Sequence, residues 1–536
     1  MAGKFLNLFS PFVRITPEIK QPDREISFKD KLIYTLVVLV LYIIMSNTPL
    51  YGLPNTEQGV DYYFWLRTIL ASQRGTLTEM GIGPIVTAGL IMQLLQGSKM
   101  INVNMADPSD RALFTGAQKV IAVFLTIFQI VAYLAGGAFG NIGTAEGELS
   151  IPLAIAIFLQ LMSAGILIMM MDEILQKGYG LGSGVSLFIA SGVAGQIFWN
   201  ALSPTGMSGD GSDGLMRGII LAFFQVLFTD KEIPGPGPNT TDPENPLLGH
   251  RLFGTRDDNL FRIRDLWIRE AGAPGLLGLI LTIVIFGIVI YVETMRVEIP
   301  LTYAGYKGYR GKYPMKLLYV SNIPVILAQA LYANFLFFGQ LIWKKAEGSS
   351  WETFGKLIGS FEQASAQSGG ASHMTPTGGL IYFLTPPQGL SALITKIRDY
   401  GDNETTEQLW EIIAHPIIYL FLFITICVFF GKIWVEVSGL APRDIAGQII
   451  NSKMQIPGFR RSEKVIEKIL KRYIPTLTIL CGFIVGILSF TADFLGCLSS
   501  GTGLLLSVGI VQNYAETISK EAASEQYPGM RGLLGN

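Results

Sequence analysis

Apolar segments of about twenty residues recur along the whole chain, and they constrain the fold more than any other feature of the sequence. A bilayer core about 30 Å thick requires about 20 residues of apolar helix to cross it. Hydrophobic residues make up 50% of the 536 residues and charged residues 15%. The sequence therefore predicts an all-α polytopic membrane protein with about ten transmembrane helices. The predicted spans are residues 32–50, 82–96, 113–134, 151–171, 185–200, 274–292, 319–343, 412–435, 474–494 and 502–519.

One further apolar run, residues 215–228, is too short to span a bilayer and is predicted to be an interfacial or re-entrant helix. The chain then has an even number of spans, with both termini on the same side. Lys and Arg gather in residues 1–31, 296–317 and 437–472, which the positive-inside rule places in the cytosol. Residues 203–272 and 344–409 are then external segments, and 521–536 form a cytosolic tail. We expect residues 1–31 to contain a surface helix rather than a cleaved signal peptide.

The second span is preceded by a break, within residues 65–95. Gly81, Gly83 and Pro84 make this break, because glycine permits a turn and proline fits the first turn of a new helix. A short half-helix at about residues 63–73 is therefore expected before a longer one. If both lie within the bilayer, the join must be buried in protein or line an aqueous cavity, since lipid cannot satisfy backbone groups. An external loop followed by an ordinary span is an equally good interpretation.

Five spans on each side of residues 203–272 predict an inverted repeat, with halves at 32–202 and 273–520. Internal similarity favours it. The second span of each half begins with an X-Pro pair, at Pro84 and Pro324, and the fifth spans begin with Gly-Ser-Gly-Val and Gly-Thr-Gly-Leu.

The middles of the spans lack charged residues and histidine. Charged residues do occur near the span ends, where we expect them to reach the membrane interface. Ion-coupled transporters usually need such groups at depth. The chain also lacks catalytic, nucleotide-binding and metal-binding motifs, so we expect no enzymatic activity, no catalytic residue, no cofactor and no metal. The polar groups at depth include Gln93 and Asn322, which could form interhelical hydrogen bonds or take part in gating.

Six segments stand out: GIGPIVTAGLIMQLL, GYGLGSGVSLFIASG, MRVEIPL followed by GKYP, YVSNIPVILAQALYANF, PGFRRSEKVIEKILKRYIP and SSGTGLLLSVGIV. Together they resemble SecY, the alpha subunit of the protein-conducting channel, in its archaeal and eukaryote-like form. They occur in the family's order and cover nearly the whole chain. The external segment 230–265 is longer than the family pattern, and the resemblance assigns it no role.

The resemblance implies a clamshell of two halves with an hourglass pore and a lateral exit between the second and seventh spans. The first half-helix would be a plug, and the second span would line both the pore and the gate. By motif, the implied pore ring is Ile82, Val86, Val185, Ile189, Ile326 and Leu506; the plug includes Trp65, Leu66, Thr68, Ile69 and Leu70; and the gate includes Gln93 and Asn322. Residues four apart share a helix face, so Ile82/Val86 and Val185/Ile189 can each point the same way. Taken singly, each ring residue is better explained as a packed core residue.

The resemblance also implies function and partners. The chain would pass unfolded secretory polypeptide across the membrane and release transmembrane segments into membrane lipid, in response to signal sequences. It would bind a SecE/gamma-type subunit and a small beta subunit. Lys307, Arg310, Arg460 and Arg461 in the basic loops would contact the ribosome, although basic cytosolic loops also suit anionic lipid. The expected location is the plasma membrane. One alternative function is a small-solute secondary transporter. Another is a structural scaffold, and the broken second span argues against the scaffold.

Overall fold

Helices dominate the computed structural model. It describes residues 9, 11–14, 16–24, 26–53, 67–98, 100–101, 103, 108–139, 150–205, 216–228, 266–267, 269, 274–303, 310–320, 323–346, 351–364, 373–387, 389–390, 393, 396–397, 409–451, 454–455 and 462–526. The first half holds α2 (Phe28–Asn47), α3 (Arg67–Leu70), α4 (Gly83–Gly97), α5 (Pro108–Ala135), α6 (Ile151–Ile174) and α7 (Gly184–Leu202). The second half holds α11 (Leu276–Thr294), α12 (Ile323–Ala346), α16 (Leu409–Val437), α17 (Pro442–Asn451), α18 (Glu463–Phe494) and α19 (Gly501–Gln526).

Seven helices in the described part of the chain are long and apolar enough to cross a membrane, which confirms a polytopic all-α membrane protein. The predicted spans at 32–50, 82–96 and 502–519 are also helical, as α2, α4 and α19. Helix α8 (Ile219–Phe228) has 10 residues and so a length of about 15 Å. It is too short to cross a core of about 30 Å, in agreement with the prediction for residues 215–228.

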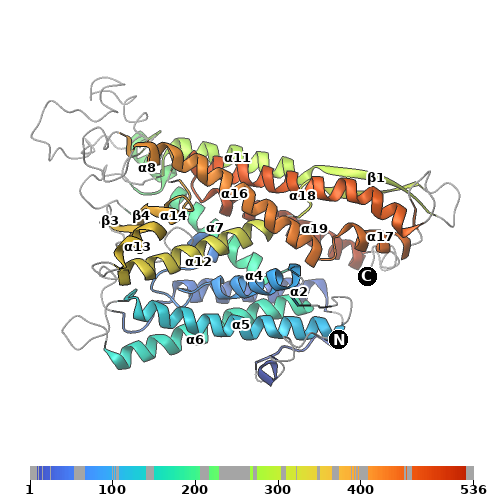
Figure 1. The fold of residues 1–536 in the computed structure, drawn as a ribbon, viewed down its shortest axis with the longest axis horizontal. Helices are drawn as coiled ribbons and strands as arrows, with labels where there is room; N and C mark the ends of the chain where they lie inside the picture. Colours follow the sequence, from blue (N-terminus) through green and yellow to red (C-terminus); the bar gives the residue numbers. More distant parts are fainter. Residues whose placement is uncertain are drawn as a thin grey trace, which may run out of the picture.

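The two halves lie one above the other in Figure 1, with α5 and α6 at the bottom and α11, α16 and α18 at the top. They meet where α4 contacts α12 and α16, and where α7 contacts α19. One large cluster of buried apolar side chains runs through both halves.

Matching features in the two halves support the predicted inverted repeat. Helices α4 and α12 both begin with a proline in the first turn, Pro84 and Pro324. The helices that open with the glycine motifs are capped by carboxylates from the preceding spans. Asp172 Oδ1 accepts a hydrogen bond from the Val185 N–H at 3.0 Å, and Asp493 Oδ1 accepts one from the Gly501 N–H at 2.6 Å. Each carboxylate satisfies an N–H that the first turn of a helix leaves free.

The N-terminal segment contains a short helix, as the sequence predicted, because residues 9 and 11–13 are helical. Residues 16–24 are irregular, and α2 begins at Phe28, where the Ser27 side chain caps it by accepting from the Asp30 N–H. The long loops also contain strands that the sequence patterns did not indicate. β3 (Ser360–Ala364) pairs antiparallel with β4 (His373–Gly378), between the short helices α13 (Glu352–Ile358) and α14 (Gly379–Tyr382).

The two basic loops meet in a single three-stranded sheet. β1 (Arg296–Tyr303) pairs antiparallel with β2 (Arg310–Lys316), and the end of β1 also pairs with β5 (Met454–Gln455). The sheet extends to the right of the bundle in Figure 1, at the end where α17 lies. Strand pairing gives the backbone groups of both loops hydrogen-bond partners within the protein.

Candidate pore, plug and lateral gate

The break before α4 depends on the backbone of Gly81. Its φ is +52°, in the left-handed region that favours glycine. A Cβ placed there would lie 2.2 Å from the carbonyl oxygen of Leu70, so a larger residue has no room. Directly beyond this turn, the N–H of Ile82 donates to the same Leu70 oxygen at 2.9 Å. The end of α3 is thus joined to the start of α4 by a main-chain contact.

The join between the two half-helices is buried in protein. Glu79 is 2% exposed, and its carboxylate pairs with Arg67 of α3 at 3.0 Å. The Gly75 N–H donates to the other oxygen of the Glu79 carboxylate, and the Ser72 hydroxyl donates to the Glu79 carbonyl at 2.6 Å. These contacts satisfy the polar groups of a non-helical segment, which is the condition that a join within the bilayer has to meet.

Helix α3 lies against the elements that carry the predicted pore ring. It contacts α7, α12 and α19, and the Tyr42 hydroxyl of α2 donates to the carbonyl oxygen of Ala71 at 2.6 Å. Of the predicted plug residues, Leu70 is buried. Thr68 and Ile69 lie in α3, but their side chains are outside the described part of the structure, as are Trp65 and Leu66 altogether.

The structure brings the six predicted ring residues into one apolar cluster. They come from the start of α4, the first turns of α7 and α12, and the beginning of α19. Ile82, Val86, Ile189 and Leu506 are buried, and Val185 and Ile326 are half-buried against the same cluster. All six side chains are aliphatic. Such a cluster offers no group that could bind an ion, although its role as a pore ring stays a prediction.

The interface between α4 and α12 is held by a polar pair that the sequence analysis missed. The Asn334 side-chain amide donates to the Thr87 hydroxyl at 3.1 Å, directly linking the two halves. Of the predicted gate residues, Gln93 lies on α4, and its buried Oε1 has no hydrogen-bond partner among the described residues; Asn322 lies outside them. Both members of the pair were in predicted spans, but no pattern in the sequence shows which positions on two helices face each other.

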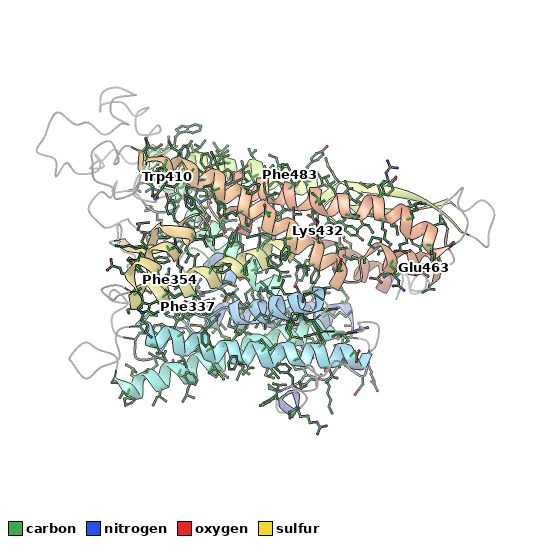
Figure 2. The ribbon with its side chains drawn as sticks, viewed as in Figure 1. Phe337, Phe354, Trp410, Lys432, Glu463 and Phe483 are labelled. Atoms are coloured by element: carbon green, nitrogen blue, oxygen red, sulfur yellow. The ribbon has the colours of Figure 1, made fainter. Side chains whose placement is uncertain are left out.

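Aromatic rings close the neighbouring interface between α5 and α12. Tyr133 stacks on Phe337 with ring centroids 5.5 Å apart, and Phe128 and Phe338 are 6.1 Å apart. Phe337, labelled in Figure 2, lies where α12 meets the helices of the first half. Beyond the rings, the Lys344 ammonium donates to the carbonyl oxygen of Gly136. The seam between the halves is therefore closed by packing and by hydrogen bonds.

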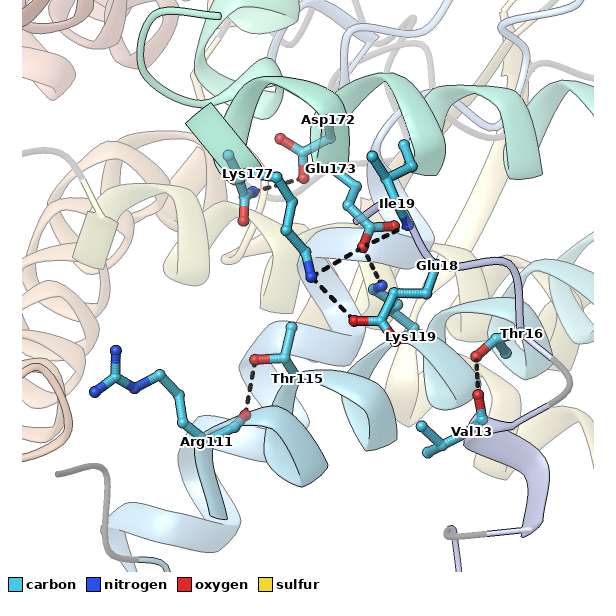
Figure 3. A network of polar contacts seen from close by, with 11 residues as sticks. Val13, Thr16, Glu18, Ile19, Arg111, Thr115, Lys119, Asp172, Glu173 and Lys177 are labelled. Atoms are coloured by element: carbon cyan, nitrogen blue, oxygen red, sulfur yellow. Dashed lines mark hydrogen bonds and ion pairs between the residues drawn. The ribbon is translucent and has the colours of Figure 1, made fainter. Parts of the chain in front are cut away.

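Some charged residues at the span ends are buried in the protein, contrary to the expectation from sequence, whereas Lys432 and Glu436 are exposed as expected. Glu173 is buried at the end of α6, and Figure 3 shows its carboxylate paired with Lys119 of α5 and with Lys177. Lys177 also pairs with Glu18 at 3.0 Å, which attaches the N-terminal segment to this cluster. The hydrogen bond from Lys177 is the main reason that the pKa of Glu18 lies below its ordinary value.

The predicted docking residues belong to the two loops that the small sheet joins. Arg310 begins β2, where it is opposite Thr302 of β1, and Thr302 also pairs with Gln455 of β5. The Arg310 side chain, and Lys307, Arg460 and Arg461, lie outside what the structure describes.

Comparison with known proteins gives a consistent result. Residues 76–515 match the SecY family, and residues 40–75 match the plug domain of Sec61p. A solved structure of a protein-conducting channel is similar over 97% of this chain and 99% of its own, with 35% identity and a TM-score of 0.72. A second, solved to study how the SecY plug domain stabilises the closed channel, has 35% identity over 97% and 99% of the two chains and a TM-score of 0.71.

A third similar structure is Sec61 in the canine ribosome-channel complex from the endoplasmic reticulum, with 34% identity, coverage of 97% and 99%, and a TM-score of 0.69. The family match includes the broken second span, the buried join and all six aliphatic ring positions. It favours the protein channel over the small-solute transporter that shares the inverted-repeat architecture. This multi-pass membrane protein belongs to the SecY family.

Proposed function

We propose that this chain is the pore-forming subunit of a protein translocase. Unfolded secretory polypeptide passes through the centre of the bundle, and apolar segments leave sideways between α4 and α12 into lipid. The observation that carries the proposal is the meeting of α3 with the aliphatic cluster built from both halves. Aliphatic side chains at a narrow point exclude ions by dewetting and offer a passing chain nothing to bind tightly.

In this proposal the described conformation is the resting state. The end of α3 is bonded to Ile82, the first residue of the ring. The Thr87–Asn334 hydrogen bond and the Tyr133–Phe337 stack close the lateral gate. A signal sequence that enters the seam replaces these contacts with its own apolar surface, which separates the halves and frees α3.

The partners are proposed from the family. A SecE/gamma-type subunit and a small beta subunit complete a heterotrimer, and the ribosome docks on the sheet that joins the basic loops. Lys307, Arg310, Arg460 and Arg461 contact ribosomal RNA, where phosphate contacts dominate affinity. The similarity to a Sec61 chain solved in a ribosome-channel complex supports this assignment. We place the chain in the plasma membrane with both termini cytosolic, as the distribution of Lys and Arg favours.

Disulfide trapping of a stalled secretory chain tests the proposal. Single cysteines replace Ile82, Val86 or Ile326, in a background where Cys427, Cys481 and Cys497 are alanine, and a second cysteine is moved along the nascent chain. We expect cross-links at all three positions that depend on a signal sequence. Ile283→Cys on the exposed face of α11 is the control and should not cross-link. Cross-links at the control but not at the ring would show that the ring is packed core.

A further inference from the structure

A separate cluster of groups surrounds the start of α8, at the far left of the bundle in Figure 1. The apolar face of α8 packs with Leu266 and with the ends of α7 and α11. Main-chain hydrogen bonds fix the segment in place, from the Leu276 N–H to the Leu266 oxygen at 2.7 Å and from the Arg217 N–H to the Thr205 oxygen at 2.9 Å. The side chains in this cluster are therefore held by rigid elements.

Two arginines lie side by side in this cluster. Arg269 is 6% exposed, and its Nη1 donates to the main-chain oxygen of Arg217 at 3.1 Å. The Arg217 side chain is half-buried, and its Nε is completely enclosed with no hydrogen-bond partner in the part of the chain that the structure describes. Burial, and then the nearby charge of Arg269, lower the pKa of Arg217. Both effects oppose a positive charge at this position.

Arg217 is not compensated by any acidic group in the described part of the chain, because none of the ion pairs there includes it. An arginine keeps its charge in proteins, so an anion in contact with this half-buried guanidinium would offset its desolvation. Arginine also presents a planar set of donors that matches a phosphate group.

The surface beside the arginines is apolar. Phe224 and Leu227 of α8 are exposed, and so is Trp267, two residues before Arg269. Tryptophan is enriched at the level of lipid headgroups, and exposed Phe and Leu next to it suit acyl chains. A soluble anion would gain nothing from these side chains, whereas a phospholipid would contact both the cations and the apolar surface.

We propose that Arg217 and Arg269 bind the phosphate group of a membrane phospholipid whose acyl chains lie against Phe224, Leu227 and Trp267. The site lies at the hinge between the halves, away from the ring and the gate. In the orientation proposed above it faces the outer leaflet.

The test uses the full chain in uncharged detergent micelles, with phosphatidylglycerol or inorganic phosphate added. We expect phosphatidylglycerol to raise the melting temperature and to remain bound in native mass spectra. In Arg217→Gln, apparent affinity should fall by about tenfold or more, because a charge-assisted contact is lost. Lys345→Gln removes an exposed charge at the same end of the bundle and should behave like the wild type.

The buried Arg269 is tested by Arg269→Lys, which keeps the charge and guards against a folding defect. It should fold and bind phosphatidylglycerol less tightly than the wild type. If inorganic phosphate gives the same Arg217-dependent stabilisation, the phosphate site stands and its source is a soluble anion. If phosphatidylglycerol has no effect, or if Arg217→Gln and Lys345→Gln respond equally, the proposal is wrong.

Discussion

Replacing Gly81 with alanine should open the resting channel to ions. The left-handed backbone at this position costs an alanine about 1–2 kcal/mol. The new Cβ would also lie 2.2 Å from the Leu70 oxygen, and this contact is with backbone, so no side chain can turn away to relieve it. The end of α3 must then move, which breaks the bond from the Ile82 N–H at about 1 kcal/mol.

Together these effects disfavour the seated position of α3 by at least about 2 kcal/mol, or roughly thirtyfold in population. The assay is the resting conductance of the purified channel in planar bilayers without a translocating chain. Gly195→Ala is the matched control, because this glycine in α7 has nothing within 4 Å of the new Cβ and no positive φ. Its conductance should equal that of the wild type.

A melting curve for each variant separates local displacement of α3 from global unfolding. If Gly81→Ala folds normally and is as tightly closed as Gly195→Ala, the contact between Leu70 and the start of α4 does not hold the channel shut. The assignment of α3 to the plug would then have to be withdrawn.

Three further predictions follow from the gate, the basic loops and the N-terminal segment. Asn334→Leu should remove an interhelical hydrogen bond worth about 0.6 kcal/mol and raise translocation of substrates with weakened signal sequences about threefold. Thr87→Val should have the same effect, and the double variant should have no larger one. Additive effects would show that the two residues do not act as a pair. Arg460→Glu should weaken ribosome binding and reduce its dependence on salt, and an unchanged salt slope would contradict a phosphate contact. The pKa of Glu18 is lowered in the folded state, so its pairing with Lys177 stabilises that state fully above the ordinary pKa of 4.5 and is lost as pH falls from 4.5 through the lowered pKa. Protease should therefore cut the N-terminal segment faster in acid. A Lys177→Met variant, already without the pair, should show a smaller change with pH.

The start of α4 was predictable because it depends on local chemistry. Glycine at 81 permits the left-handed turn and proline at 84 fits the first turn of a helix, and α4 begins at Gly83 accordingly. The spans were predictable for a similar reason, since about 20 apolar residues have one stable state in a bilayer. The start of α2 also has a local cause, because the Ser27 side chain caps the helix, whereas residues 16–24 before it are irregular.

The candidate site was harder to predict from the sequence than the spans. The ring positions came from resemblance, because an aliphatic residue in a pore and one in a packed core look alike in a sequence. The partner of Asn334 could not be found, since Thr87 lies 247 positions away on a helix of the other half. The joining of the two basic loops through β1 and β5 was missed for the same reason.

The sequence by itself determined that the chain is a membrane protein of about ten spans with a broken second span and a repeated architecture. These properties follow from hydrophobic length, from the backbone freedom of glycine and from the fixed φ of proline, which act over a few residues. Only the tertiary structure decided that the break is buried, that Asp172 and Asp493 cap helices instead of facing water, and that α3 rests against both halves. Each of these depends on contacts between distant segments, and such contacts are set by how the helices pack.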